Sequence, residues 1–392
     1  MRIKFCGAAR EVTGSQHLLM VGNKQILLDC GLNQGKREEA IKKNRDFLFD
    51  PKKIDAVVLS HAHIDHSGNL PNLVKQGFGG PIYCTSATAD LSYYMLLDSA
   101  YIQEQDARYL AKHRIRQVGM RGPLYTTQHA QKAIEQLTPI KYGEEIELNR
   151  QMSLRFLDAG HVLGSAISLL TIKQKEGDYR LVYTGDLGRK GLPILRDPEV
   201  VKQADFLITE STYGNKEHIP VENIEKELQQ VIKDTAKKGG KIIIPAFSLE
   251  RTQELIYHLE LLFEKKKIPS LPVFVDSPLA INLTEVFRKH PECYDKELQE
   301  EFTNNRKNPF GFGRIKYVTD VQHSKKLNAL IGPAIIISAS GMCENGRIRH
   351  HLANNIEDPR NTILIVGFMA EETLGRKLVE KRKVVRIFGK FC

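Results

Sequence analysis

The amino-acid sequence predicts an α/β protein in which two kinds of sheet follow one another along the chain. Short β-rich segments such as RIKFCG, SQHLLMV and KQILLDCG lie close together near the start, which favours sheets packed face to face. Beyond Tyr213, helical segments alternate with apolar strands, which is the order of a parallel α/β unit. A chain of 392 residues is long enough for two domains and for a core that needs no disulfides.

The first half contains one long predicted helix between two groups of strands. Residues 86–113 carry apolar side chains at helical spacing, and Ser86 is the expected N-cap. The strand DAVVLS precedes this helix, and the predicted strands after it are MSLRFLDAG, AISLLTI, YRLVYTGD and ADFLITES. Three of the later strands end in polar side chains, so we expect these side chains to share one rim of the fold.

The second half repeats a helix–strand alternation. Residues 221–240 predict a helix closed by two glycines, and the apolar strand KIIIPAF follows it. The helix ERTQELIYHLELLFEKKK and the strand LPVFVD repeat the pattern. Residues from about 295 to 313 are polar and are expected to be irregular. The alternation then resumes through SKKLNALIGPAIIISASG, RIRHHLANNI and NTILIVGF.

Charge and cysteine content narrow the class of protein. The formal net charge of +10 favours an anionic partner such as nucleic acid, and it fits a role in solubility equally well. The six cysteines lie far apart without a C-x-x-C pair, which suits a reducing compartment. The start lacks the apolar stretch of a signal peptide, and no later segment is apolar enough to cross a bilayer. We therefore expect a soluble cytoplasmic protein.

The segment LSHAHIDHSG concentrates side chains that bind metals. His61, His63, Asp65 and His66 follow directly after an apolar strand. A tight loop can turn such closely spaced donors toward one point, and imidazole with carboxylate, without thiolate, suits zinc or a similar divalent ion. Chance seldom places four donors in six residues, so we interpret this loop as part of a metal site.

Further ligands are expected at neighbouring strand ends, because one loop seldom completes a metal site. His161 in DAGHVLGSA and Asp186 in YTGDLG are the best candidates, although either alone could be an ordinary turn residue. Asp29 in ILLDCG could shape a turn before Gly31, or it could accept a hydrogen bond from a ligand histidine and fix that ring.

The order of these residues resembles the metallo-β-lactamase fold, an αββα sandwich with one or two metals along its rim. TESTYG at residues 209–214, PAFSLERTQEL, SASGM and NTILIVGFMAEETLGRKL also resemble the β-CASP branch of that fold. This branch contains RNA-processing nucleases, among them RNase J-like enzymes and the endonuclease of the cleavage and polyadenylation machinery. The resemblance covers essentially the whole chain and implies a metallo-β-lactamase domain with an inserted parallel α/β β-CASP domain. Its expected parts are residues 1–210, 211–354 and, returning to the first domain, 355–392.

The resemblance assigns a role to each candidate residue. It makes His61, His63 and His161 ligands of one Zn²⁺, makes Asp65 and His66 ligands of a second, and places Asp186 between the two. Glu210, which opens the β-CASP insert, would assist proton transfer or orient the site, although a turn carboxylate is the simpler interpretation. The residues expected to take part in the chemistry are Asp29, Asp65, Asp186 and Glu210.

Two features depart from the family pattern. Relatives usually carry one more histidine after the segment matching VVRIFG, whereas this chain stops at Cys392, which suggests a truncation that leaves the second metal one ligand short. Relatives also commonly have glycine where Glu372 stands, so a position with positive φ or a close backbone approach is expected to be altered there.

The segment SASGMCENGRIRHHL is the expected contact with RNA. Small residues and backbone donors ahead of a helix can hold a phosphate, although a tight turn beside solvated arginines fits the pattern equally well. The candidate RNA-binding residues are Ser338, Ser340, Gly341, Arg347 and Arg349. Lysine and arginine side chains would hold a single strand mainly through its phosphates.

The function expected from these features is zinc-dependent hydrolysis of RNA by endonuclease action, 5′ exonuclease action or both. Two metal ions can lower the pKa of a shared water and supply hydroxide for attack on phosphorus, and the resemblance implies products with a 5′-phosphate and a 3′-hydroxyl. A hydrolase of lactams or thioesters, and an RNA-binding protein that cuts poorly for want of the last ligand, remain alternatives. A homodimer is compatible with the sequence.

Overall fold

The computed structural model describes residues 1–35, 37–113, 122–175, 177–215, 217, 221–305, 310 and 315–392. These residues form two compact units, Met1–Asn215 and Lys216–Cys392. Each unit has its own sheets and its own core. The boundary falls a few residues after residue 210, where the resemblance places the end of the first domain.

Unit 1 contains two sheets. The six-stranded sheet has the order β1 (Arg2–Phe5), β2 (His17–Val21), β3 (Lys24–Leu28), β4 (Ala56–Val58), β5 (Ile82–Thr85), β6 (Leu137–Ile140). The five-stranded sheet has the order β11 (Phe206–Ile208), β10 (Gly177–Tyr183), β9 (Ala166–Gln174), β8 (Met152–Asp158), β7 (Glu145–Asn149). Strands β3 to β6 are parallel neighbours, and β10 runs parallel to β11. The remaining pairs are antiparallel.

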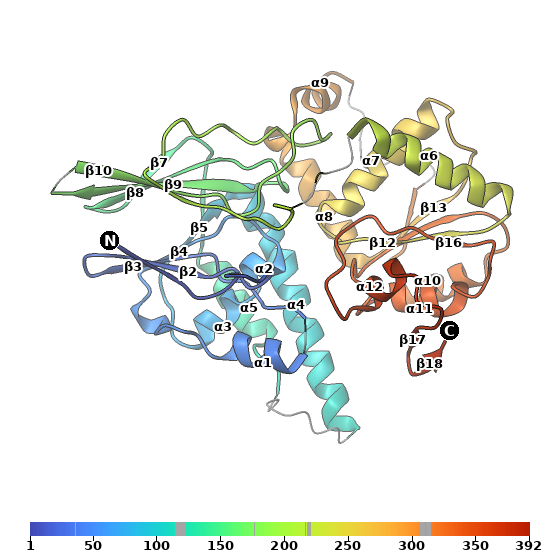
Figure 1. The fold of residues 1–392 in the computed structure, drawn as a ribbon, viewed down its shortest axis with the longest axis horizontal. Coiled ribbons are helices and arrows are strands. Elements are labelled where there is room, and N and C mark those ends of the chain that lie inside the picture. The colour runs from blue at the N-terminus through green and yellow to red at the C-terminus, as the bar shows by residue number, and fades with distance from the viewer. Residues whose placement is uncertain are drawn as a thin grey trace. The chain divides into compact units, whose positions relative to one another are not determined.

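The two sheets of unit 1 pack face to face, as the closely spaced strands predict. In β8, every second residue from Met152 to Asp158 is buried, which is the pattern of a strand with one face on a core. The layer between the sheets joins Phe156 and Leu170 of one sheet to Leu28 and Val58 of the other. Figure 1 shows these two layers of strands.

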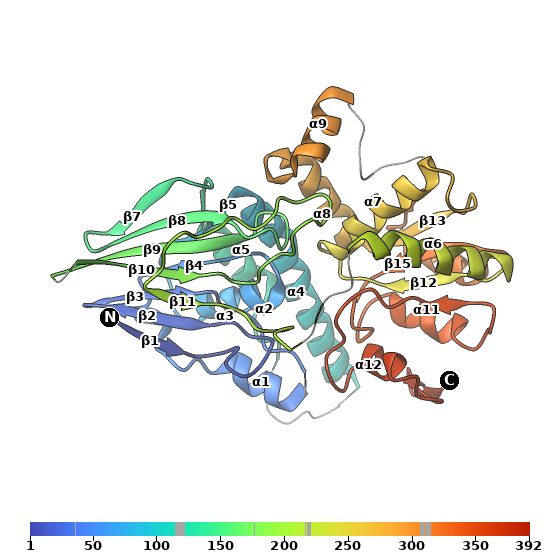
Figure 2. The same ribbon diagram turned by 45° about the horizontal axis from the view of Figure 1, so that its top comes forward.

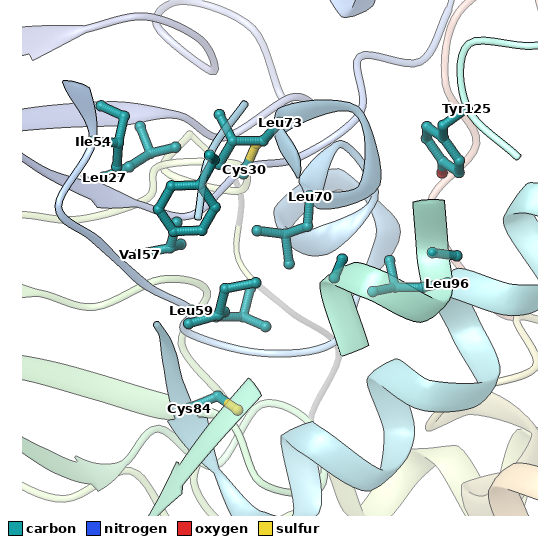
Figure 3. Packing of buried hydrophobic residues seen from close by; sticks show 14 of the residues in the cluster. Leu27, Cys30, Ile54, Val57, Leu59, Leu70, Leu73, Cys84, Leu96 and Tyr125 are labelled. Atoms are coloured by element: carbon teal, nitrogen blue, oxygen red, sulfur yellow. The ribbon is translucent and has the colours of Figure 1, made fainter. Parts of the chain in front are cut away.

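Helices cover the other face of the six-stranded sheet. They are α1 (Arg37–Arg45), α2 (Ile64–Ser67), α3 (Leu70–Lys75), α4 (Ser86–Lys112) and α5 (Thr127–Glu135), and a short 3₁₀ helix spans Pro51–Lys53. Leu70 and Leu73 of α3, together with Leu96 of α4, lie in one apolar cluster with strand residues such as Leu27 and Val57 (Figure 3). Burying each such side chain stabilises the fold by about 1.5–3 kcal/mol. The loops at the strand ends are therefore attached to a well-packed core.

Helix α4 confirms the long helix predicted after Ser86, with one correction at its start. Thr85 is the N-cap, because its side chain accepts a hydrogen bond from the backbone N–H of Thr88. Ser86 is the first helical residue rather than the cap. Either hydroxyl residue suits a helix start, so the sequence alone does not distinguish them.

Unit 2 is built on a five-stranded parallel sheet, as the helix–strand alternation predicts. Its order is β14 (Ile315–Tyr317), β13 (Val273–Asp276), β15 (Ile335–Ser338), β12 (Ile242–Pro245), β16 (Thr362–Ile363). Its helices are α6 (Val221–Lys237), α7 (Arg251–Glu264), α8 (Pro278–Lys289), α9 (Lys296–Asn305), α10 (Val321–Asn328), α11 (Ile348–Asn355) and α12 (Leu374–Val379), with a 3₁₀ helix at Pro291–Cys293. Helices α6 and α7 lie on one face of the sheet, and α10 and α11 lie on the other (Figures 1 and 2).

The end of the chain packs within unit 2. Strand β16 pairs with β12, and the hairpin of β17 (Arg386–Ile387) and β18 (Lys390–Phe391) contributes Ile387 to the core of this unit. In the structure, residues 355–392 thus contact the inserted part of the chain. The three-part division into residues 1–210, 211–354 and 355–392 stays a prediction.

The expectation of irregular structure from residue 295 to residue 313 is wrong for its first half. Helix α9 occupies Lys296–Asn305, and Leu298 is 1% exposed. Residues 306–309 and 311–313 of this predicted stretch lie outside the described residues. All six cysteines are free thiols. Among the described residues, no helix is long and apolar enough to cross a membrane.

Candidate metal centre

Four strand ends of unit 1 carry the predicted site residues to one rim. Asp29 follows β3, the HAHIDH loop follows β4, His161 follows β8, and Asp186 follows β10. Strands β3 and β4 are parallel neighbours, so their carboxyl ends lie at the same edge of the sheet. A backbone hydrogen bond from Ala166 N, at the start of β9, to Ser60 O, 2.9 Å long, joins the two sheets at this edge.

Ligand atoms of four residues converge at the rim. His61, His63, His161 and Asp186 each offer one atom, and these atoms lie within 4.8 Å of one another. His63 Nδ1 is 3.1 Å from His61 Nε2 and 3.2 Å from His161 Nε2, and Asp186 Oδ2 is 3.5 Å from His161 Nε2. A tetrahedral zinc ion bound at 2.0–2.1 Å would hold its ligand atoms about 3.4 Å apart. The donor set and its spacing fit a divalent cation.

Asp186 faces a second histidine with its other oxygen. Asp186 Oδ1 lies 3.2 Å from His66 Nε2, while Oδ2 faces His161. The carboxylate thus has one oxygen toward each of these two histidines, and its place between two ions stays a prediction. The group of four ligand atoms does not include Asp65 or His66. Burial raises the pKa of Asp65, His66 lowers it, and Asp186 raises it, so Asp65 lies within electrostatic reach of both.

Burial and neighbouring charges set the protonation of the cluster. Burial holds the pKa of His61 well below its ordinary value, and His66 and His63 lower it further. Burial also acts to lower the pKa of His66, but the carboxylates of Asp186 and Asp29 outweigh it and raise this pKa well above its ordinary value. Although burial alone would raise the pKa of Asp186, His66 and the other histidines lower it. Metal ions bind neutral imidazole and ionised carboxylate, so the lowered pKa values of His61 and Asp186 favour binding, whereas His66 must release a proton to bind.

Asp29 lies behind the histidines and is fully buried. Its Oδ1 accepts a hydrogen bond from Ser60 N at 2.7 Å. Its Oδ2 accepts from Ser60 Oγ at 2.7 Å, His66 Nδ1 at 2.6 Å and Tyr183 Oη at 2.5 Å. Asp29 thus has the geometry of the predicted acceptor that fixes a ligand histidine. Ser60 and Tyr183 were not among the predicted residues.

Two residues after Asp29, a close backbone approach requires glycine. A Cβ at Gly31 would lie 1.6 Å from the backbone oxygen of Asp65. Cys30 N also donates to His66 O at 2.8 Å, so the chain after β3 runs directly against the HAHIDH loop. Any side chain at Gly31 would displace this loop.

The His161 loop is held by hydroxyl groups that the sequence analysis did not single out. Ser165 Oγ accepts from His161 N at 3.0 Å and from Val162 N at 3.2 Å. The hydroxyls of Thr85 and Thr88 both donate to Gly164 O, at 2.6 Å and 2.8 Å. The start of α4 thereby positions His161. No local signal marks the contacts of Thr85 and Thr88, because these residues lie 79 and 76 positions from Gly164 in the chain.

Glu210 follows β11 and contacts the loop that carries Asp186. Its Oε1 accepts from Leu187 N at 3.0 Å, and its Oε2 accepts from Thr212 N at 3.3 Å. The carboxylate therefore restrains the residue next to Asp186. This contact fits the predicted orienting role, which stays a prediction.

The predicted RNA-binding residues lie at the end of β15 in unit 2. Ser338 is buried, and its hydroxyl donates to Asp276 O at 2.9 Å. Arg347 donates to Asp276 Oδ1 at 2.6 Å and to the backbone oxygens of Val318 and Thr319. Both side chains are thus used to hold the loop between β15 and α11.

The three remaining candidates have different surroundings. A Cβ at Gly341 would lie 2.7 Å from the ring of Phe247, so this glycine permits close packing. Ser340 O accepts from Cys343 N at 3.1 Å within the turn. Arg349 is half-buried, and its guanidinium lies over the ring of Phe388 at 4.4 Å. Contact of these residues with RNA stays a prediction.

Two family models match the chain. The metallo-beta-lactamase superfamily domain matches residues 18–200, and the Beta-Casp domain matches residues 252–378. The first match covers the strands and loops that carry the histidine cluster. The second covers most of unit 2.

Curated relatives match the chain over almost its whole length. Ribonuclease TTHA0252 of Thermus thermophilus is 38% identical over 99% of this chain and 84% of its own. Transcription termination factor FttA of Methanosarcina mazei is 32% identical over 100% of this chain and 59% of its own length. FttA of Methanocaldococcus jannaschii is 34% identical over 99% of this chain and 59% of its own. The chain therefore spans less than two thirds of the FttA proteins.

Proposed function

Because this chain belongs to the β-CASP family of the metallo-β-lactamase superfamily, we propose that it is a metal-dependent ribonuclease that hydrolyses the phosphodiester bonds of single-stranded RNA. The observation that supports the proposal most is the convergence of four ligand atoms within 4.8 Å at the rim of unit 1. The Thermus thermophilus relative named as a ribonuclease extends this support, since it matches 99% of the chain. The net charge of +10 also suits a polyanionic substrate.

We propose that the site holds two Zn²⁺ ions. His61, His63 and His161 would hold the first, Asp65 and His66 the second, and Asp186 both. When bound, such ions supply hydroxide near neutral pH and neutralise the charge that develops on the phosphodiester. The orientation of the two Asp186 oxygens toward different histidines supports the sharing of this carboxylate.

The other residues of the site would hold and orient these groups. Asp29 keeps the ring of His66 turned so that Nε2 faces Asp186. Glu210 restrains the loop after Asp186 through Leu187 N, which keeps the carboxylate in place as charge develops on the substrate. Cleavage within a strand, from its 5′ end, or both are compatible with this arrangement. A homodimer and a cytoplasmic location stay predictions.

Cleavage of RNA by the zinc-loaded full chain tests this proposal. We expect His63→Ala and Asp186→Ala to lower the rate at least about 100-fold, because each removes a metal ligand. His323→Ala is the matched control, since this histidine is 68% exposed in unit 2. Cleavage at the parent rate by both ligand variants would refute the proposal. A circular RNA, which has no ends, separates endonuclease from exonuclease action.

A substrate panel tests the alternative that the rim hydrolyses small molecules. Nitrocefin, a thioester and RNA would be compared with the same zinc-loaded protein. We expect the protein to turn over RNA and neither of the other two substrates. Turnover of nitrocefin or the thioester without RNA cleavage would favour a small-molecule hydrolase, and RNA binding without any turnover would favour a binding protein.

A further inference from the structure

The buried hydrogen bonds behind the rim determine where the protons of two ligand histidines lie. We propose that Tyr183 and Ser60 are positioning residues that, through Asp29, keep a proton on Nδ1 of His61 and of His66 and leave Nε2 of both rings to bind metal. This inference rests on the proposed metal site and concerns groups that contact the ligands rather than the ions.

The direction of each hydrogen bond follows from Asp29. An ionised carboxylate only accepts hydrogen bonds, so every group around Asp29 must donate to it. Tyr183 Oη, Ser60 Oγ and His66 Nδ1 all lie within 2.7 Å of Asp29 Oδ2. Each of these three atoms therefore carries a proton that points at the carboxylate.

These hydrogen-bond directions determine which ring nitrogen of His66 carries the proton. Its Nδ1 donates to Asp29, so the nitrogen left for a cation is Nε2. His66 Nε2 lies 3.2 Å from Asp186 Oδ1, on the side of the rim where the ligand atoms gather. The opposite arrangement, with Nδ1 unprotonated, would place two acceptors 2.6 Å apart in the interior.

Through Ser60, the same reasoning about hydrogen-bond directions applies to His61. The one proton of the Ser60 hydroxyl goes to Asp29, so Ser60 Oγ can only accept from His61 Nδ1, which lies 2.9 Å away. His61 therefore donates from Nδ1 and presents Nε2, the atom 3.1 Å from His63 Nδ1. A single serine hydroxyl thus transmits the orientation set by Asp29 to a second ligand.

Tyr183 fixes the carboxylate from the opposite sheet. It is the last residue of β10, whereas Asp29 follows β3, so the hydrogen bond joins the two layers of the sandwich. Because Tyr183 donates to Asp29, its oxygen accepts from Ser15 Oγ at 2.9 Å. Ser15 N in turn donates to Asp65 O at 2.8 Å. Asp186 lies three residues beyond Tyr183, so this bond also positions the strand end that carries the shared ligand.

Burial makes the arrangement depend on these groups alone. Asp29 is 0% exposed, Ser60 is 1%, and Ser15 and Tyr183 are 3% exposed. A donor lost from such a site leaves a carboxylate with one fewer partner and no bulk water to replace it. Removing one of these donors should therefore weaken metal binding more than removing the hydroxyl of a buried tyrosine elsewhere in the protein does.

Metal binding by the full-length chain tests the proposal. The Zn²⁺ dissociation constant would be measured by competition with a chelator, and the visible spectrum of the Co²⁺-loaded protein would report the geometry of the site. We expect Ser60→Ala and Tyr183→Phe to weaken Zn²⁺ binding by about 10- to 100-fold and to change the Co²⁺ spectrum. Ser60→Thr retains a hydroxyl and should restore both properties to nearly the parent values.

Tyr294→Phe is the matched control, because this buried tyrosine of unit 2 donates its hydroxyl to a backbone oxygen, that of Phe287. Zn²⁺ binding within threefold of the parent in Tyr183→Phe would overturn the role of Tyr183, and the same result in Ser60→Ala would overturn that of Ser60. An equal loss in Tyr294→Phe would show general destabilisation and also overturn the proposal. Should Tyr183→Phe fail to fold, the Ser60→Ala and Ser60→Thr pair still decides it. Tight Zn²⁺ binding by the parent without RNA cleavage would refute the proposed function and leave this inference standing.

Discussion

The carboxylate of Asp276 should carry much of the stability of unit 2, and Asp276→Asn tests this with little change in shape. Asp276 is the last residue of β13, and its side chain is fully buried. Its Oδ1 accepts from Arg347 Nη1 at 2.6 Å, and its Oδ2 accepts from Ser324 Oγ at 2.5 Å and His351 Nε2 at 2.7 Å. The carboxylate thus joins the end of β13 to the starts of α10 and α11.

The magnitude follows from these three bonds. An asparagine presents only one oxygen, so at least one of the three donors would face an amide N–H₂. An unmade buried hydrogen bond to a charged group costs about 1.5–3 kcal/mol, and the bonds that remain become weaker neutral ones. We therefore expect Asp276→Asn to lower the free energy of unfolding of unit 2 by about 3 kcal/mol.

Hydrogen exchange measures this change within unit 2, because a chain of two units need not unfold in one step. The amides of β13 and β15 would be followed at increasing denaturant concentration in the parent and in Asp276→Asn. Asp358→Ala is the control, since this carboxylate pairs with Arg360 on the surface. A decrease below about 1 kcal/mol in Asp276→Asn, or an equal decrease in the control, would refute the reasoning.

Two further predictions concern pH and backbone strain. Burial raises the pKa of Asp158 from 3.8 to about 6, partly opposed by its hydrogen bond to Gly160 N. Stability from this group is therefore full below about pH 4 and is lost as pH rises through 6, so Asp158→Asn should raise the free energy of unfolding at pH 8 by up to about 3 kcal/mol. Denaturant titrations of the parent and Asp158→Asn at pH 4 and pH 8 check this. A difference in free energy of unfolding between the two proteins that is the same at both pH values contradicts it. Glu372 has φ 66° and an exposed side chain, so Glu372→Gly should stabilise unit 2 by about 0.5–1 kcal/mol, whereas Glu371→Gly next to it should not. Exchange of unit 2 amides compares the two variants, and equal effects would show that the positive φ does not matter.

The histidine cluster was predictable because its residues form patterns within short stretches of the sequence. His61, His63 and His66 fall in one short loop, and His161 and Asp186 each follow an apolar strand. Strand ends of packed sheets meet at one rim, so the pattern alone brings these side chains together. The helix–strand alternation of the second half was equally predictable, since each apolar run occupies one strand of a parallel sheet.

The supporting hydroxyls could not be predicted in the same way. Ser60, Tyr183 and Thr85 are ordinary strand-end residues in the sequence, and they gain a role only from partners far along the chain. Tyr183 reaches Asp29 because β10 and β3 belong to sheets that pack together, a fact that no local pattern encodes. Helix α9 was missed for a related reason, since its sequence is mostly polar although Leu298 is buried in the core.

The two units show why a polar residue at a strand end does not by itself indicate a binding site. In unit 2, Asp276 and Ser338 end neighbouring parallel strands, and Arg347 lies close by, but acceptors there face donors and the hydrogen bonds are complete. In unit 1, ring nitrogens of His61, His63 and His161 face one another within 3.2 Å along two contacts that share a single atom, His63 Nδ1. A proton on that atom can serve only one contact well, whereas a cation between the rings satisfies all of them. The balance of donors and acceptors, rather than the sequence pattern, therefore separates a structural network from a site built to receive an ion.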